Sequence, residues 1–181
     1  MEFTEKTIRL KDGREAILRS AQPGDAAEMV AFMKTTAGET EFLLRYPEEC
    51  TMDAAGEAAF LDDVLNSGDQ VMPCCFVDGK LAGNAMLSMN SRLKTRHRAT
   101  VAIGLLREYW GLGIGTALFG ELIAIAKERG LDHLELDYIE GNDRARYLYE
   151  KMGFVETARV PDVYRLKDDS MRKSILMMKK L

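Results

Sequence analysis

The junction between an apolar run and a glycine-rich turn, at residues 101–118, constrains this chain more than any other feature. Residues 101–106 are apolar and predict a strand, and the turn Trp-Gly-Leu-Gly-Ile-Gly-Thr follows at 110–116. Beyond it, apolar residues recur at helical spacing: Ile114, Leu118, Leu122 and Ile125. A helix that begins here leaves about four backbone N–H groups unpaired and carries a partial positive charge. The junction therefore predicts a site for a phosphate or pyrophosphate.

The glycine spacing excludes two common nucleotide-binding motifs. A dinucleotide fingerprint, Gly-x-Gly-x-x-Gly, would need a glycine at Thr116 or Leu118, and a Walker loop would need a lysine that the turn lacks. What remains, Gly111-Leu-Gly-Ile-Gly-Thr116, resembles the acyl-CoA pyrophosphate loop of the Gcn5-related N-acetyltransferase (GNAT) superfamily. Trp110 stands where that pattern usually has Gln or Arg. The alternative is a glycine-rich turn without a ligand.

A second block, residues 142–154, carries the same resemblance. Its sequence, Asn-Asp-Arg-Ala-Arg-Tyr-Leu-Tyr-Glu-Lys-Met-Gly-Phe, is similar to the GNAT pattern Asn-x-x-Ala-x-x-Leu-Tyr-x-x-x-Gly-Phe. Its distance from the glycine turn suits one helix plus one strand. The resemblance covers roughly residues 95–160 and implies acetyl-CoA as cosubstrate.

The elements read from the sequence predict one domain over residues 1–181. We expect an α/β fold of the α+β type, a central mixed, mostly antiparallel twisted sheet with helices on both faces, as the resemblance also implies. Asp12-Gly13 and Asp78-Gly79 predict hairpins. The predicted strands are 7–10, 15–19, 71–77, 80–89, 98–106, 133–139, 154–160 and 174–180. Helices are expected from Pro23, after a cap at Thr51, after the glycine turn, and from Asn142 or Asp143; residues 36–50 predict a loop or broken helix.

The resemblance assigns the coenzyme contacts to three short segments. Backbone hydrogen bonds to the pantetheine arm are assigned to Leu105, Leu106 and Arg107. Backbone amides that hold the pyrophosphate are assigned to Leu112, Gly113, Ile114, Gly115 and Thr116. Asn142 matches the family residue that contacts the coenzyme arm, and it is equally suited to cap a helix.

Acetyl transfer to an amine requires a base, a donor for the oxyanion and a proton for the leaving thiolate. Tyr149 matches the family tyrosine that protonates the thiolate; its alternative is a core aromatic. Asp137 lies five residues before Asn142, where ribosomal-protein N-acetyltransferases carry an acidic residue, although it also suits a sheet edge. Glu41 and Glu39 are rival bases, and bulk water without a dedicated base is a further option.

Charge gives one indication of the acceptor. Residues 39–69 hold nine acidic residues and one basic residue, Arg45. Such a segment predicts a negative field that attracts a cationic amine, with a solvated helix face as the alternative. Four basic residues alternate along a predicted strand edge, where they face either coenzyme phosphates or water: Arg92, Lys94, Arg96 and Arg98.

The rest of the composition limits the classes of partner that we expect for this chain. A formal net charge of −4 argues against nucleic acid, and no apolar run approaches the roughly 18 residues of a membrane span. Three cysteines, two histidines and an N-terminus without a signal-peptide core predict a cytoplasmic protein without a disulfide framework or metal site. We expect a small-molecule or peptide amine as partner, cationic at neutral pH, and a homodimer is left open.

The sequence as a whole predicts an N-acetyltransferase that moves an acetyl group from acetyl-CoA to a primary amine by direct attack in a ternary complex. A catalytically silent acyl-CoA-binding regulatory module is the first alternative. A phosphate-binding interaction domain is the second.

Overall fold

A computed structural model describes residues 1–181, and nine strands form one sheet in it. The strand order is β1-β2-β4-β5-β6-β7-β9-β8, with β3 pairing with β5. The strands are β1 (Lys6–Arg9), β2 (Glu15–Ser20), β3 (Gln70–Val71), β4 (Pro73–Val77), β5 (Lys80–Met89), β6 (Arg98–Leu105), β7 (His133–Ile139), β8 (Val155–Arg165) and β9 (Met171–Lys180). The helices are α1 (Ala26–Glu39), α2 (Ala54–Asn66), α3 (Ile114–Glu128) and α4 (Asp143–Lys151).

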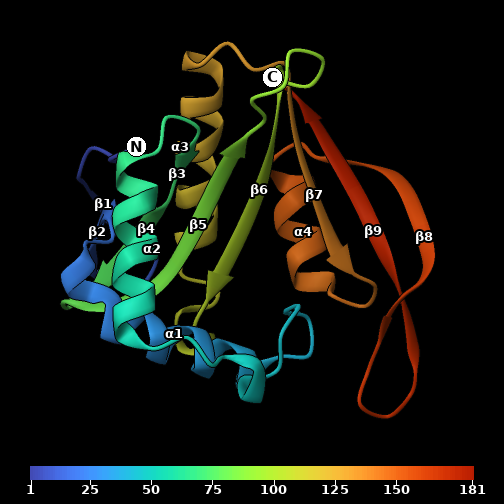
Figure 1. The fold of residues 1–181 in the computed structure, drawn as a ribbon, viewed down its shortest axis with the longest axis horizontal. Coiled ribbons are helices and arrows are strands. Elements are labelled where there is room, and N and C mark those ends of the chain that lie inside the picture. The colour runs from blue at the N-terminus through green and yellow to red at the C-terminus, as the bar shows by residue number, and fades with distance from the viewer.

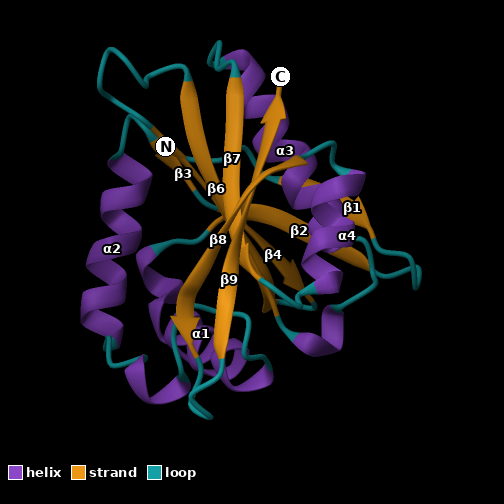
Figure 2. Ribbon diagram, turned by 90° about the vertical axis from the view of Figure 1, so that its right-hand side faces the viewer, coloured by secondary structure: helices purple, strands orange, loops and turns teal.

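The sheet is mixed, and only the pair of β6 and β7 is parallel. Figure 2 shows the sheet edge-on, with α1 and α2 on one side and α3 and α4 on the other. The predicted fold class is therefore confirmed. None of the helices combines the length and the apolar composition that a membrane span needs.

Each face of the sheet carries its own hydrophobic core. The core under α3 and α4 includes Leu118, Phe119 and Tyr149, and the core under α1 and α2 includes Met29, Phe32 and Leu61. Strand β4 supplies both, because successive side chains of a strand point to opposite faces. Its buried residues divide accordingly, with Cys75 and Val77 in the first core and Cys74 and Phe76 in the second.

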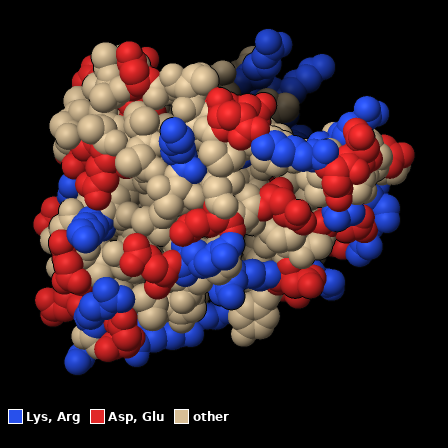
Figure 3. Space-filling model, turned by 90° about the horizontal axis from the view of Figure 1, so that it is seen from below, with Lys and Arg blue, Asp and Glu red and all other residues tan.

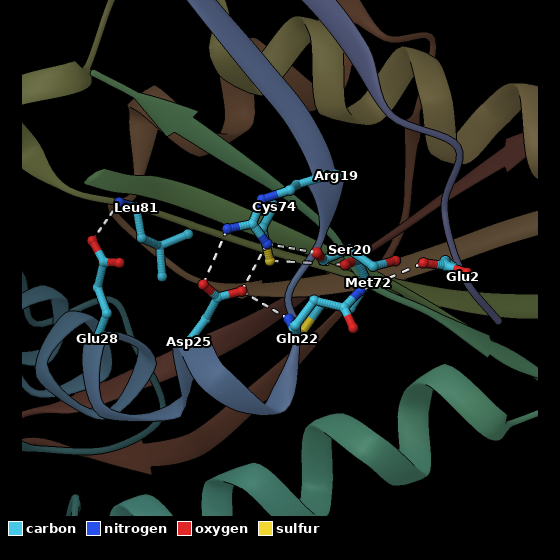
Figure 4. A network of polar contacts seen from close by, with 9 residues as sticks. All are labelled: Glu2, Arg19, Ser20, Gln22, Asp25, Glu28, Met72, Cys74 and Leu81. Atoms are coloured by element: carbon cyan, nitrogen blue, oxygen red, sulfur yellow. Dashed lines mark hydrogen bonds and ion pairs between the residues drawn. The ribbon is translucent and has the colours of Figure 1, made fainter. Parts of the chain in front are cut away.

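A polar network fixes the start of α1. The Arg19 guanidinium lies 3.7 Å from the centre of the Phe76 ring and donates to both Asp25 oxygens at 2.7 and 3.0 Å (Figure 4). This bond holds the pKa of Asp25 below its usual value. One turn further, Glu28 accepts a 2.6 Å hydrogen bond from the backbone N–H of Leu81 in β5. The network attaches the first turns of α1 to the sheet and thereby determines where the C-terminal end of this helix lies.

Several predicted boundaries were wrong. Helix α1 continues to Glu39, into the predicted loop, and α2 is capped by Asp53, whose side chain accepts from Gly56 N at 2.8 Å, not by Thr51. The predicted strand 71–77 divides at Met72 into β3 and β4. Pro73 suggests an edge or a bulge in this strand, and it is the first residue of β4, where a missing N–H is tolerated. Strand β4 is not an edge, because it lies between β2 and β5, but its pairing with β5 shifts register between Cys75 and Phe76.

The last hairpin is longer than predicted. Strand β8 continues past Val160 to Arg165, and β9 begins at Met171. The pairing shifts register between Val160 and Tyr164, where Asp162 adopts a φ of 54°. Such a bulge interrupts the alternation of side chains, so the pattern could not reveal that the strand resumes.

Candidate active site

Strand pairing in the sheet is interrupted where its one parallel pair separates, and we call this gap in the pairing the β6–β7 cleft. Strands β6 and β7 pair only from Arg98–Thr100 to His133–Glu135. Beyond these residues they diverge, as Figure 1 shows, while β6 stays paired with β5 and β7 with β9. The facing edges of β6 and β7 are left unpaired. An extended ligand can lie between the strands and hydrogen-bond to such edges.

The glycine turn follows β6 at this cleft. Gly111 and Gly113 have φ values of 82° and 97°, which only glycine adopts readily, and Gly113 caps α3. The first acceptor within the helix is the Gly113 carbonyl, which bonds Ala117 N at 3.0 Å. None of the backbone N–H groups from 112 to 116 donates to a protein acceptor. The turn therefore presents a set of free donors, as an anion site requires.

Gly115 has a packing role besides the backbone-amide role assigned to it from the sequence. A Cβ at this position would lie 3.0 Å from Leu148 Cδ2 and 3.4 Å from Leu105 Cδ1. The missing side chain lets α3 pack closely against α4 and β6.

Basic side chains surround the turn. The Lys11 backbone N–H donates to the Leu112 carbonyl at 3.1 Å, and Lys151 Nζ lies 3.2 Å from Thr116 Oγ1. The Arg144 guanidinium lies 4.5 Å from the centre of the Trp110 ring. Figure 3 views this end of the molecule, where Lys and Arg side chains gather near the middle of the face with Asp and Glu around them. This group could not be identified from the sequence, because Lys11 lies in the turn between β1 and β2 whereas Arg144 and Lys151 lie in α4.

The basic residues singled out by sequence lie elsewhere. Only Arg98 is in β6, whereas Arg92, Lys94 and Arg96 lie in the turn before it, so the predicted alternation along a strand edge was wrong. Arg98 pairs with Glu135 at 2.5 Å, at the end of β6 opposite the glycine turn. This position favours the solvent-facing alternative for the group.

Trp110 closes the turn in place of the usual polar residue. Its Nε1 donates to the Leu105 carbonyl at 3.0 Å, and Arg107 also lies over its ring at 5.5 Å. The Leu106 N–H bonds the Ala82 carbonyl at 3.0 Å. The Arg107 N–H donates to Glu39 Oε2 at 2.7 Å. The three residues assigned to pantetheine thus lie at the cleft, but these groups already have partners within the protein.

Asn142 caps α4, which is the second of the two roles expected for it. Its Oδ1 accepts a 3.2 Å hydrogen bond from Ala145 N. Its amide nitrogen donates to no protein acceptor. One side chain therefore satisfies the helix terminus and keeps a donor for a ligand.

Tyr149 is 7% exposed, and its ring lies 5.5 Å from that of Phe119 and 5.8 Å from that of Tyr138. Its hydroxyl makes no hydrogen bond within the protein. Burial raises the pKa of Tyr149 well above its usual value, and the negative charge of Asp137 raises it further. The phenol is therefore a proton donor at neutral pH, close enough to Asp137 to be affected by its charge.

Asp137 is exposed on β7 and is held by two hydroxyl groups. Its Oδ2 accepts from Tyr164 Oη at 2.7 Å and from Ser174 Oγ at 2.9 Å. Both donors come from elements distant in the sequence, β8 and β9, and could not be identified from the chain alone. The negative charge of Asp137 acts on the Tyr149 phenol, and both residues remain candidates for the catalytic roles assigned from the sequence motifs.

The other candidate bases are placed differently. Glu41 is exposed and makes no hydrogen bond or ion pair, whereas Glu39 is occupied by Arg107. Most acidic residues of 39–69 have local structural partners: Glu48 pairs with Lys167, Glu49 accepts from Tyr46 N, Asp53 caps α2, and Asp69 bonds Ser67. These contacts favour structural roles for much of the segment.

Comparisons with known proteins agree with this geometry. Residues 38–154 match the model of the acetyltransferase (GNAT) family, for which acetyl-CoA is the cosubstrate. A streptothricin acetyltransferase from Streptomyces lavendulae is 32% identical over 158 residues, covering 75% of this chain and 79% of that protein. A [ribosomal protein bS18]-alanine N-acetyltransferase from Haemophilus influenzae is 48% identical over 54 residues, which span 30% of this chain and only 36% of that relative.

Solved structures show the same fold. A GNAT acetyltransferase from Streptococcus pneumoniae superposes with a TM-score of 0.86 at 29% identity, covering 92% of this chain and 99% of that one. The yncA acetyltransferase from Salmonella typhimurium, solved with acetyl-CoA, gives a TM-score of 0.79 at 20% identity, covering 92% and 94%. With its free helix terminus at the β6–β7 cleft and its match over residues 38–154, this chain belongs to the GNAT acetyltransferase family.

Proposed function

We propose that this protein is an acetyl-CoA-dependent N-acetyltransferase that acts on a primary amine by direct attack in a ternary complex. The observation that carries the proposal is the set of free backbone N–H groups of residues 112–116 at the start of α3. These groups suit a pyrophosphate, and Tyr149 and Asp137 are the candidate proton donor and proton acceptor.

The binding roles are assigned from the hydrogen-bond donors and the charges that remain available to a ligand. The amides at the start of α3 would hold the pyrophosphate, and Lys11, Arg144 and Lys151 would add positive charge around it. The unpaired edge of β6 would align the pantetheine arm, and Asn142 would offer its free amide nitrogen. Glu39 must release the Arg107 N–H before a ligand can use that donor.

The chemical roles rest on Asp137 and Tyr149. Acetyl-CoA supplies an activated acyl group, whose C–S bond breaks as the new C–N bond forms. Asp137 would accept the proton that the attacking amine loses, directly or through water. Tyr149 would donate its phenolic proton to the leaving sulfur, and its raised pKa keeps that proton in place at neutral pH.

The acceptor class is proposed from charge and from the relatives. The names of two relatives specify an antibiotic and the alanine of a ribosomal protein as acceptors. For this chain we propose a cationic small-molecule or peptide amine. Glu41 and other acidic residues of 39–69 remain exposed, and Glu39 of the same segment contacts Arg107. A negative field raises the local concentration of such a cation.

The test is release of the free CoA thiol from acetyl-CoA on adding primary amines, from polyamines to peptides with free N-termini. We expect amine-dependent release by the wild type and stabilisation against heat by CoA alone. Stabilisation without release for any amine would favour the silent regulatory module. Absence of both would contradict the coenzyme site itself.

A further inference from the structure

The hydroxyl groups that hold Asp137 come from the last hairpin of the chain. Tyr164 lies near the end of β8, just past the bulge at Asp162, and Ser174 lies near the start of β9. Tyr164 Oη is 2.7 Å and Ser174 Oγ is 2.9 Å from Asp137 Oδ2, and the two hydroxyl oxygens are 3.4 Å apart. The extended part of the hairpin therefore forms part of the candidate active site.

Both donors bind the same carboxylate oxygen. Asp137 Oδ2 has two hydrogen bonds, whereas Oδ1 has none, and no lysine or arginine forms an ion pair with this carboxylate. Burial and, after it, the negative charge of Asp137 raise the pKa of two tyrosines, Tyr149 of α4 and Tyr164 of β8. The Asp137 carboxylate is thus hydrogen-bonded by neutral hydroxyl groups at only one of its two oxygens.

We propose that Tyr164, together with Ser174, is a positioning residue that holds Asp137 by Oδ2 and leaves Oδ1 free to accept the proton of the attacking amine. This inference rests on the proposed function. In the step, the amine proton passes to Oδ1, and both hydroxyl groups keep their own protons.

The kinetic test compares kcat with KM in Tyr164→Phe and Ser174→Ala, with Tyr147→Phe as control because Tyr147 is 72% exposed on α4. Loss of one hydrogen bond to a charged group corresponds to a change of about tenfold or more. We expect kcat to fall by about that factor in both site variants, with KM for the amine close to the wild-type value. The control should match the wild type.

A wild-type kcat in both Tyr164→Phe and Ser174→Ala, with unchanged melting temperatures, would overturn the inference. Ser174→Ala keeps the inference testable if Tyr164→Phe does not fold, because it removes the second donor without altering β8.

A second measurement does not depend on activity. Burial and the hydrogen bond to Asp137 raise the pKa of Tyr164, against the opposing effect of its bond with Ser174. The titration of this phenol, taken as the absorbance difference between the wild type and Tyr164→Phe, should move to lower pH in an Asp137→Asn background. An unchanged titration would contradict the contact, whereas a wild type that acetylates no amine would contradict only the proposed function.

Discussion

The carboxylate of Glu39, the last residue of α1, accepts a 2.7 Å hydrogen bond from the backbone N–H of Arg107, and the Arg107 side chain donates to the Glu39 carbonyl. The contact joins the end of a helix on one face of the sheet to the strand end that leads into the glycine turn. It places a negative charge beside the site proposed for an anionic coenzyme. Glu39 therefore competes with the coenzyme for this backbone donor.

We expect Glu39→Gln to bind CoA about three- to tenfold more tightly than the wild type, because the variant removes a charge and weakens a competing hydrogen bond. Isothermal titration calorimetry measures the change. Glu41→Gln is the matched control, since Glu41 is exposed and has no partner. Weaker CoA binding by the Glu39 variant would show that the contact supports the site.

The left-handed backbone conformation of Gly113, the cap residue of α3, leads to a second prediction. Its φ of 97° is strained for any other residue, so Gly113→Ala should distort the free amides and weaken CoA binding by about tenfold or more. Gly120→Ala, in α3 with no atom within 4 Å of the added Cβ, is the control and should bind CoA normally. Equal affinities in the two variants would remove the pyrophosphate from this turn.

Gly115→Ala should instead act through packing. The added Cβ would meet Leu148 Cδ2 at 3.0 Å, so the contact between α3 and α4 must give way. We expect a lower melting temperature together with weaker CoA binding, whereas Gly113→Ala affects mainly binding. Thermal unfolding with and without CoA separates the two effects, and an unchanged melting temperature in the absence of CoA would contradict this role of Gly115.

Tyr149→Phe should keep the fold and CoA affinity but lower kcat by about 10²–10⁴-fold, the usual contribution of a positioned proton donor. The phenyl ring preserves the contacts with Phe119 and Tyr138. Tyr138→Phe is the control, because it removes a buried phenolic hydroxyl from a ring 5.8 Å away. If both variants turn over at the wild-type rate, Tyr149 is a packing residue.

Because Glu57 is buried, we expect the free energy of unfolding to depend on pH. Its side chain is 2% exposed and makes no hydrogen bond, and burial raises its pKa, opposed only by the charge of Arg45. Because the folded pKa is raised, the associated stability is fully present below the ordinary glutamate pKa of about 4.3 and is lost as pH rises through the folded value. At neutral pH the buried charge therefore costs stability.

Glu57→Gln should accordingly raise Tm by about 2–4 °C at pH 7–8, with a smaller gain near pH 4, where the wild-type carboxyl is protonated. Differential scanning calorimetry at the two pH values checks this. Asp62→Asn, on an exposed position of the same helix, controls for the loss of a charge from α2. A gain that is the same at both pH values would assign the effect to packing.

The sequence by itself determined the features that short segments encode. Gly111 and Gly113 predicted a turn between a strand and a helix, and both glycines adopt a positive φ. Asp78-Gly79 predicted a two-residue hairpin, which has φ values of 51° and 78°. Asn142 predicted a cap, and it bonds the backbone three residues later. Each of these depends on the conformational preference of a few neighbouring residues, so the pattern in the chain is sufficient to reveal it.

Only the tertiary structure decided which distant side chains meet at the cleft. Tyr164 reaches Asp137 because a bulge shifts the pairing of β8 and β9, and a one-residue change in register would point its side chain to the other face. Lys151 and Lys11 reach the glycine turn through the packing of other elements against it. Hydrophobic periodicity specifies which face of an element is buried but not what lies opposite its polar side chains, because those contacts depend on strand register and on the paths of the connecting loops.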